Sequence, residues 1–213
     1  RKESQLEWRN KFSIINAIRD EIKEYFPYKV IQIETAEADD IIGTIIHDIE
    51  GSHLMNGQSK PILIMSGDKD FIQLHKYSNV SQYDPVRKRW IKFDNPEKYL
   101  IEHICKGDRG DGVPNILSKD DCFINGRQKP LRSKVLNTFI DMRNIEEVEN
   151  SLTEHKTNWN RNRRLVDLSL VPDFIKNEVI SQYKQEHNIE RDQLYGYFVN
   201  KRLKTLMENI GDF

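Results

Sequence analysis

The sequence predicts an α/β protein, with a parallel sheet covered by helices in its first half. Over the first hundred residues, amphipathic helical segments alternate with short apolar runs. The second half consists of charged segments with a helical pattern that follow a glycine-containing loop. A chain of 213 residues is also long enough to bury a core.

The first predicted helix begins at Ser4, which stands three residues before Glu7 in the spacing of a capping box. Apolar residues then recur with a helical period as far as Tyr25, and Pro27 ends the helix. Residues 28–34 (YKVIQIE) follow and read as a short buried strand.

The remaining elements of the first half are set by apolar spacing and by turn residues. Isoleucines share one face of a predicted helix over 36–51, which Gly51 closes. A strand is predicted at 61–65, a short helix at 71–77, and two strands over 80–93 around an Asp-Pro turn. A helix over 96–106 completes this half.

From residue 107 onward the pattern is helical, apart from one strand expected near residues 195–199. This change predicts two domains: an α/β core over residues 1–106 and a mainly helical region over residues 107–213.

Composition limits the classes of protein to consider. Mean hydropathy is −0.72, and no apolar run approaches the length of a membrane helix. Cys105 and Cys122 form neither a disulfide framework nor a zinc motif, so we expect a reducing, cytoplasmic location. The net charge of −1 argues against an overtly basic nucleic-acid binder, so the distribution of charge matters more than its sum.

Three acidic pairs fall at predicted connections. They are Glu37 with Asp39, Asp68 with Asp70, and Asp108 with Asp111. The carboxyl ends of adjacent parallel strands meet at one crevice, so we expect the first two pairs to face each other. Any single pair could simply cap a helix or start a turn, but three such pairs favour one shared pocket.

Carboxylates this close would repel one another and raise each other's pKa unless cations neutralise them. Oxygen ligands without histidine or cysteine favour Mg²⁺ or Mn²⁺. We therefore expect the three pairs to hold divalent metal, with Asp40 as a helix N-terminal charge. His75, His103 and Cys105 are expected to be packing or surface residues.

Basic residues offer candidate contacts to phosphate. Lys106 and Arg109 stand in the glycine-containing segment 106–116, which reads either as a phosphate grip or as a solvent loop. Two further basic stretches could bind a nucleic-acid backbone or be ordinary solvated faces. The predicted nucleic-acid-binding set is Arg1, Lys2, Lys69, Lys106, Arg109, Lys119, Arg127, Lys129, Arg132, Arg161, Arg163 and Arg164.

The motifs resemble those of a known family. Glu37-x-Asp39, then SGDKDFIQL and then KGDRGDGVPNI resemble the 5′-nuclease, or flap endonuclease, superfamily, which has a PIN-like core. The segments PDFIKNEVISQYK and YFVNKRLKTLMENIGDF are similar to the branch formed by the ribonucleases H of T-even bacteriophages.

This resemblance implies a Mg²⁺-dependent, structure-specific 5′-nuclease that uses two metal ions and removes RNA primers during replication. It implies catalytic and metal-binding roles for Glu37, Asp39, Asp68 and Asp70, with Asp108 and Asp111 completing the metal site. DNA, RNA–DNA duplexes and 5′ flaps would be the substrates. A single-stranded-DNA-binding protein and a sliding clamp are implied partners, in the host cytoplasm and without a membrane.

The sequence departs from the family pattern at two places. Gly112 stands where the family has Asn and Asn115 where it has Gly, which bears on the family's duplex-gripping turn. The family's first strand, with its metal-binding Asp, has no counterpart here, so we expect residues 1–213 to need an N-terminal segment of the same enzyme for activity.

Two other readings stay open. The chain could be a noncatalytic nucleic-acid-binding subunit that retains the carboxylates. A phosphatase with an aspartate nucleophile at Asp68 or Asp70 is weaker, because the extra acidic pairs suit a two-metal site better.

Overall fold

The computed structural model describes residues 2–56 and 60–213. The chain divides into two compact units, one of residues 1–34 with 181–213 and one of residues 35–180. The predicted boundary between residues 106 and 107 falls inside the second unit. The functional division that we predicted there stays a prediction.

The first unit contains α1 (Lys2–Tyr25), α9 (Arg191–Lys201), α10 (Lys204–Glu208) and η3 (Ile210–Asp212). Tyr25, which ends α1, stacks on Tyr197 of α9 with ring centroids 4.7 Å apart. The hydroxyl of Tyr197 donates a hydrogen bond to Glu21 at 2.7 Å, and Lys201 forms an ion pair with the same carboxylate. Aromatic packing and one shared carboxylate thus join the two ends of the sequence.

The predicted strand near residues 195–199 is wrong, because these residues lie within α9. Aromatic and β-branched residues favour strands, but Leu194, Tyr197 and Phe198 have i, i+3, i+4 spacing and are all buried. A helix buries all three on one face and satisfies its own backbone hydrogen bonds. The strand predicted over residues 28–34 is also wrong. These residues, all of them described, pair with no strand and are exposed or half-buried.

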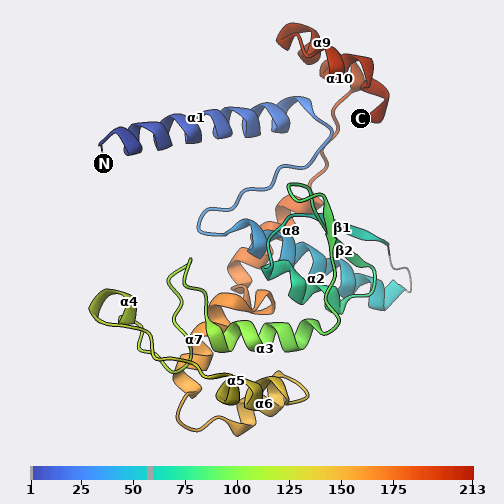
Figure 1. Ribbon diagram of the computed structural model, residues 1–213. Helices are drawn as coiled ribbons and strands as arrows, with labels where there is room; N and C mark the ends of the chain where they lie inside the picture. Colours follow the sequence, from blue (N-terminus) through green and yellow to red (C-terminus); the bar gives the residue numbers. More distant parts are fainter. Residues whose placement is uncertain (1, 57–59) are drawn as a thin grey trace. The chain divides into compact units, whose positions relative to one another are not determined.

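The second unit is built on a small mixed sheet of three strands in the order β1-β2-β3 (Figure 1). β1 (Ile62–Met65) pairs in parallel with β2 (Val80–Asp84), and β2 pairs antiparallel with β3 (Arg89–Ile91). The α/β class and the strands predicted over 61–65 and 80–93 are confirmed. The sheet is mixed, because the Asp-Pro turn reverses the chain between β2 and β3.

Helices account for the rest of the second unit. They are α2 (Ala38–Asn56), η1 (Asp70–Lys76), α3 (Pro96–Lys106), α4 (Cys122–Asn125), α5 (Ser133–Ile140), α6 (Ile145–Ser151), α7 (Lys156–Val166) and η2 (Leu168–Leu170). α8 (Asp173–Lys184) begins here and ends in the first unit. α2 continues beyond Gly51, where we had predicted its end, and the predicted short helix at 71–77 is a 3₁₀ helix.

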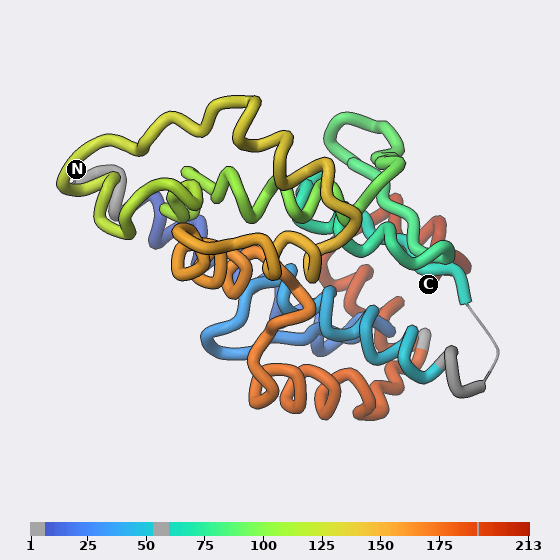
Figure 2. Tube along the Cα trace, turned by 90° about the horizontal axis from the view of Figure 1, so that it is seen from below, coloured from blue at the N-terminus to red at the C-terminus, as the bar shows by residue number. Residues whose placement is uncertain are grey.

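α3 forms over the predicted residues because its start is coded locally. Asn95 accepts a hydrogen bond from the Lys98 backbone N–H, and Pro96 occupies the first helical position. Its apolar face, with Ile101 and Ile104 fully buried, packs on Trp159 of α7. α3 and α7 lie side by side in Figures 1 and 2.

A second cluster packs α2, η1 and η2 against the inner face of the sheet, with Ile46, Ile64, Leu74 and Leu168 buried. Val166 belongs to the first cluster and Leu168 to the second, and Gln73 of η1 forms hydrogen bonds with the backbone of both residues, so the segment after α7 lies beside η1. No helix in the described ranges has the length and apolar character that crossing a membrane requires.

Candidate metal and nucleic-acid site

The three acidic connections converge on one cavity of the second unit. This cavity measures about 450 Å³ and is lined by carboxylates from the start of α2, the start of η1 and the loop after α3. Its acidic lining residues are Glu37, Asp39, Asp40, Asp70, Asp108, Asp111 and Asp167, the last of which forms an ion pair with Arg163. Asp68 is absent from this lining, but its charge contributes to raising the pKa of Asp70.

The first pair stands at the N-terminus of α2. Asp40 accepts a hydrogen bond from the backbone N–H of Glu37 at 3.1 Å, so this side chain caps the first turn. The helix dipole favours negative charge here. Asp39 raises the pKa of Glu37, while burial raises the pKa of Asp39. The structure agrees with Asp40 as a helix N-terminal charge and adds that it lines the cavity.

The second pair leaves the carboxyl end of β1. Asp68 accepts a hydrogen bond from the backbone N–H of Asp70 at 3.0 Å. Gln82, fully buried in β2, donates its amide hydrogens to the carbonyls of Ser66 (2.9 Å) and Asp68 (2.5 Å). Gly67 allows the backbone after β1 to pass close to Asp84 of β2, because a Cβ at Gly67 would lie 2.9 Å from a carboxylate oxygen of Asp84.

Asp70 has the most perturbed carboxyl group of this cavity. Burial, followed by the charges of Asp68 and Asp39, raises its pKa from 3.8 to about 7. The folded chain thus holds this carboxyl where ionisation is unfavourable unless a cation compensates for it.

The third pair lies in the loop that follows α3. Asp108 accepts a hydrogen bond from the Gly110 N–H at 2.6 Å, and its own carbonyl accepts one from Val113 N–H at 2.6 Å. Gly107 has φ +65°, and a Cβ there would lie 2.4 Å from the Val113 carbonyl oxygen. Glycine is therefore required for the loop to turn back toward the cavity.

His103 lies between the second and third pairs, which corrects our expectation of a packing or surface role. Its Nδ1 is 3.5 Å from Asp70 and its Nε2 is 3.9 Å from Asp108, and the side chain is 13% exposed. Burial lowers its pKa, and the charge of Asp108 opposes that shift. The available sequence signal was its position one turn before the end of α3, five residues before Asp108.

The oxygen donors fit a hard divalent cation, because the cavity gathers carboxylates that raise one another's pKa. Within the described ranges, no three histidine, cysteine, aspartate or glutamate side chains form a group placed to hold a metal ion. Mg²⁺ keeps several water ligands and binds proteins through one or two carboxylates plus substrate phosphates. The donor set is therefore compatible with hydrated metal rather than with a closed protein cage.

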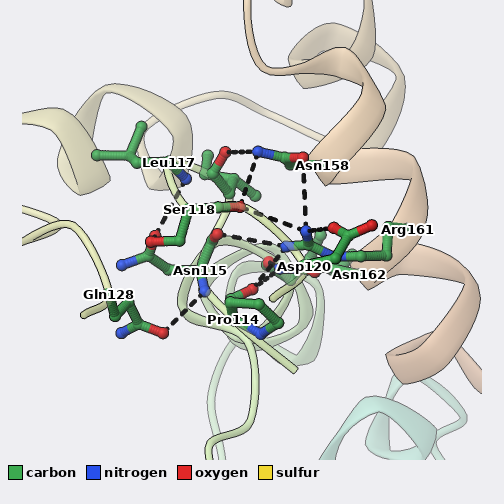
Figure 3. Close-up of polar contacts among 11 residues, drawn as sticks. Pro114, Asn115, Leu117, Ser118, Asp120, Gln128, Asn158, Arg161 and Asn162 are labelled. Atoms are coloured by element: carbon green, nitrogen blue, oxygen red, sulfur yellow. Dashed lines mark hydrogen bonds and ion pairs between the residues drawn. The ribbon is translucent and has the colours of Figure 1, made fainter. Parts of the chain in front are cut away.

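The three arginines of α7 have different surroundings. Arg164 is exposed and lines the acidic cavity. Arg163 forms ion pairs with Glu149 and Asp167, and Arg161 pairs with Asp120 and with backbone carbonyls (Figure 3). Arg164 is thus the residue of this stretch best placed to meet a phosphate in the cavity.

The other predicted nucleic-acid contacts stay predictions. Most of these side chains are exposed, and Lys106 forms an ion pair with Glu102. The exposed ones are Lys69, Lys106, Arg109, Lys119, Arg127, Lys129 and Arg132. Arg1 and the side chain of Lys2 lie outside the described residues.

Comparisons with known proteins identify the family of this chain. A model of the 5′-3′ exonuclease N-terminal resolvase-like domain matches residues 1–103, and a model of the C-terminal region of T4 RNase H matches residues 94–213. The chain is 31% identical to the ribonuclease H of Enterobacteria phage T4, over 100% of this chain and 70% of that protein.

A crystal structure of the T5 D15 protein, co-crystallised with metal ions, has a similar fold. The TM-score is 0.60 at 17% identity, covering 100% of this chain and 72% of the other. The matched models and the extended identity lead to one conclusion: this chain belongs to the 5′-3′ exonuclease family of nucleases, in the branch of the phage T4 ribonuclease H.

Proposed function

We propose that the chain acts as a Mg²⁺-dependent 5′-nuclease that hydrolyses phosphodiester bonds in RNA–DNA duplexes and 5′ flaps. The convergence of three acidic connections on one cavity, with Arg164 at its lining, carries this proposal. A cavity that gathers several carboxylates suits hydrolysis by a metal-activated water, which needs no side-chain nucleophile. The named relatives support the nuclease class.

Glu37, Asp39, Asp68 and Asp70 would hold the ions, and Asp108 and Asp111 would bind them through water. Two bound Mg²⁺ ions would supply a water nucleophile and stabilise the leaving oxygen. Arg164 would attract the phosphate into a cavity whose other charged lining residues are mostly acidic. His103, which lies between Asp70 and Asp108, would exchange a proton with either carboxylate.

The wider assignment is also part of the proposal. Residues 1–106 would supply most of the metal site, and residues 107–213 would bind the duplex. A single-stranded-DNA-binding protein, a sliding clamp and an N-terminal segment of the same enzyme are proposed partners.

A cleavage assay on a 5′-flap DNA and on an RNA–DNA duplex tests the proposal. With the N-terminal segment of the T4 relative supplied, wild type should cleave both substrates in Mg²⁺ and lose cleavage in EDTA; without that segment it should cleave neither. Arg164→Ala should raise KM and lower the slope of log affinity against log salt by about 0.9, because one phosphate contact is lost. Cleavage that persists in EDTA would overturn the metal mechanism.

A noncatalytic nucleic-acid-binding unit is the second candidate. It is favoured by the absence, in the described part of the chain, of a group of three side chains placed to hold a metal. In that case the chain would bind flap DNA with the same salt dependence but cleave it under no metal condition. Isothermal titration with Mg²⁺ and Mn²⁺ would separate the two candidates.

A further inference from the structure

α7 presents three polar side chains to the loop that carries the third acidic pair. Figure 3 shows Asn158, Arg161 and Asn162 directed from this helix toward the backbone of residues 114–118. This part of the loop turns back on α3, because the Ile116 N–H donates to the Cys105 carbonyl at 3.1 Å. The residues that make these contacts are not among those that line the acidic cavity.

Asn162 joins the end of α3 to the end of the acidic turn. Its side chain is fully buried, and its amide hydrogens donate to the carbonyls of Ile104 and Pro114, both at 2.8 Å. Asn158, one turn earlier on α7, donates to two carbonyls of the loop, those of Ile116 (2.8 Å) and Ser118 (3.0 Å). Four backbone carbonyl oxygens that accept no backbone hydrogen bond within a helix or strand thus accept hydrogen bonds from side chains of α7.

Arg161 binds the same segment with its guanidinium. Its Nε donates to the Asn162 carboxamide oxygen at 2.8 Å, and its Nη2 donates to the Pro114 carbonyl at 2.9 Å. Its Nη1 pairs with the exposed Asp120 and donates to the Ser118 carbonyl at 3.3 Å. The side chain is only 17% exposed, so its planar set of donors is committed to the protein.

Hydrogen bonds within the loop connect residues 114–118 to the turn that carries Asp108 and Asp111. Asn115, which is buried, accepts hydrogen bonds from Leu117 N–H (3.1 Å) and from the Ser118 hydroxyl (2.8 Å), and it donates to the Lys129 carbonyl. The hydrogen bond from Val113 N–H to the Asp108 carbonyl then ties the held segment to the acidic turn. A shift of residues 114–118 would therefore move Asp108.

We propose that Arg161 is a positioning residue: its guanidinium holds the backbone oxygens of residues 114–118, and with them the turn from Asp108 to Asp111, and it does not contact nucleic-acid phosphates. The catalytic consequence rests on the proposed function, whereas the structural role stands on the contacts alone. This assignment replaces direct phosphate binding, which the sequence suggested for Arg161.

The test compares Arg161→Ala with Arg164→Ala, its matched control on the cavity side of the same helix. Arg161→Ala should accelerate amide hydrogen exchange in residues 107–118 at least tenfold, lower kcat at least tenfold, and leave KM and the salt slope of DNA binding unchanged. Guanidinium ion at millimolar concentration should restore part of kcat by entering the vacated position. Arg164→Ala should change the salt slope and leave exchange in the loop unaltered.

Arg161→Lys is a second variant in case Arg161→Ala fails to fold. Lysine keeps the charge but cannot donate hydrogen bonds to Pro114, Ser118 and Asn162 at the same time. Exchange in its loop should lie between that of wild type and Arg161→Ala. Unchanged loop exchange in a folded variant, or a salt slope lowered by about 0.9, would overturn the positioning role. Faster loop exchange beside a wild type that cleaves nothing even with the N-terminal segment supplied would refute the proposed function and leave the positioning role intact.

Discussion

Asp70→Asn should stabilise the metal-free protein at pH 8, because wild type must hold an ionised carboxylate among other carboxylates. Burial and the charges of Asp68 and Asp39 raise the pKa of Asp70 from 3.8 to about 7. A carboxyl with a raised pKa contributes stability that is fully present below its unfolded pKa and is lost as pH rises through its folded pKa. Asparagine resembles the protonated carboxyl at every pH.

The magnitude follows from the two pKa values. Their difference is about 3, which at 1.36 kcal/mol for each pH unit gives about 4 kcal/mol as an upper value. The side chain of Asp70 is 23% exposed, so solvent screens part of this cost. A gain of about 2 kcal/mol for Asp70→Asn at pH 8 is therefore expected, falling toward zero near pH 4.

Urea unfolding of both proteins at pH 4, 6 and 8 in EDTA measures the difference. At pH 8, Mg²⁺ should stabilise wild type more than Asp70→Asn, because bound cation neutralises the carboxylate. Asp84→Asn is a suitable control with the opposite sign. The backbone N–H groups of Arg87 and Val86 lower the pKa of Asp84, so removing this carboxylate should destabilise the protein at pH 8. An Asp70→Asn protein no more stable than wild type at pH 8 would refute the reasoning.

Further outcomes are expected at other positions. Asp39→Asn and Asp68→Asn should each abolish cleavage and preserve DNA binding by gel shift, since an amide removes an anionic ligand and leaves the basic residues in place; wild-type turnover in either would contradict the site. Gly107→Ala should lower the free energy of unfolding by at least about 1–2 kcal/mol, because φ is +65° and the new Cβ would clash with the Val113 carbonyl, whereas Gly51→Ala in α2 should raise it by about 0.5–1 kcal/mol. Thermal unfolding measures both, and equal effects would be inconsistent with this geometry. Gln82→Leu should cost about 1–3 kcal/mol in urea unfolding, because the Ser66 and Asp68 carbonyls lose a buried donor, and unaltered stability would show that water replaces it.

Local sequence determined the parts of this protein whose signals lie within a few residues. Asn95 and Pro96 start α3 at the predicted residue, and the apolar run before Gly67 forms β1. The order of the acidic pairs predicted a shared pocket without any coordinates, and the structure brings five of those six carboxylates to one cavity. Each of these signals depends on backbone propensity, capping or the polarity of strand ends, which neighbouring residues carry.

Only the tertiary structure decided which of the candidate side chains reach the acidic cavity and which are used in contacts within the protein. An arginine reads the same in sequence whether it meets solvent or carbonyl oxygens, and the difference between Arg161 and Arg164 arises from the loop folded against one side of α7. His103 joined the acidic site because α3 passes beside both Asp70 and Asp108. Residues 195–199 became helical because burial of Leu194 and Phe198 outweighed strand propensity. For Arg161, Arg164 and His103, contacts between residues distant in sequence set the outcome; for residues 195–199, such contacts decided between strand propensity and a local i, i+3, i+4 spacing.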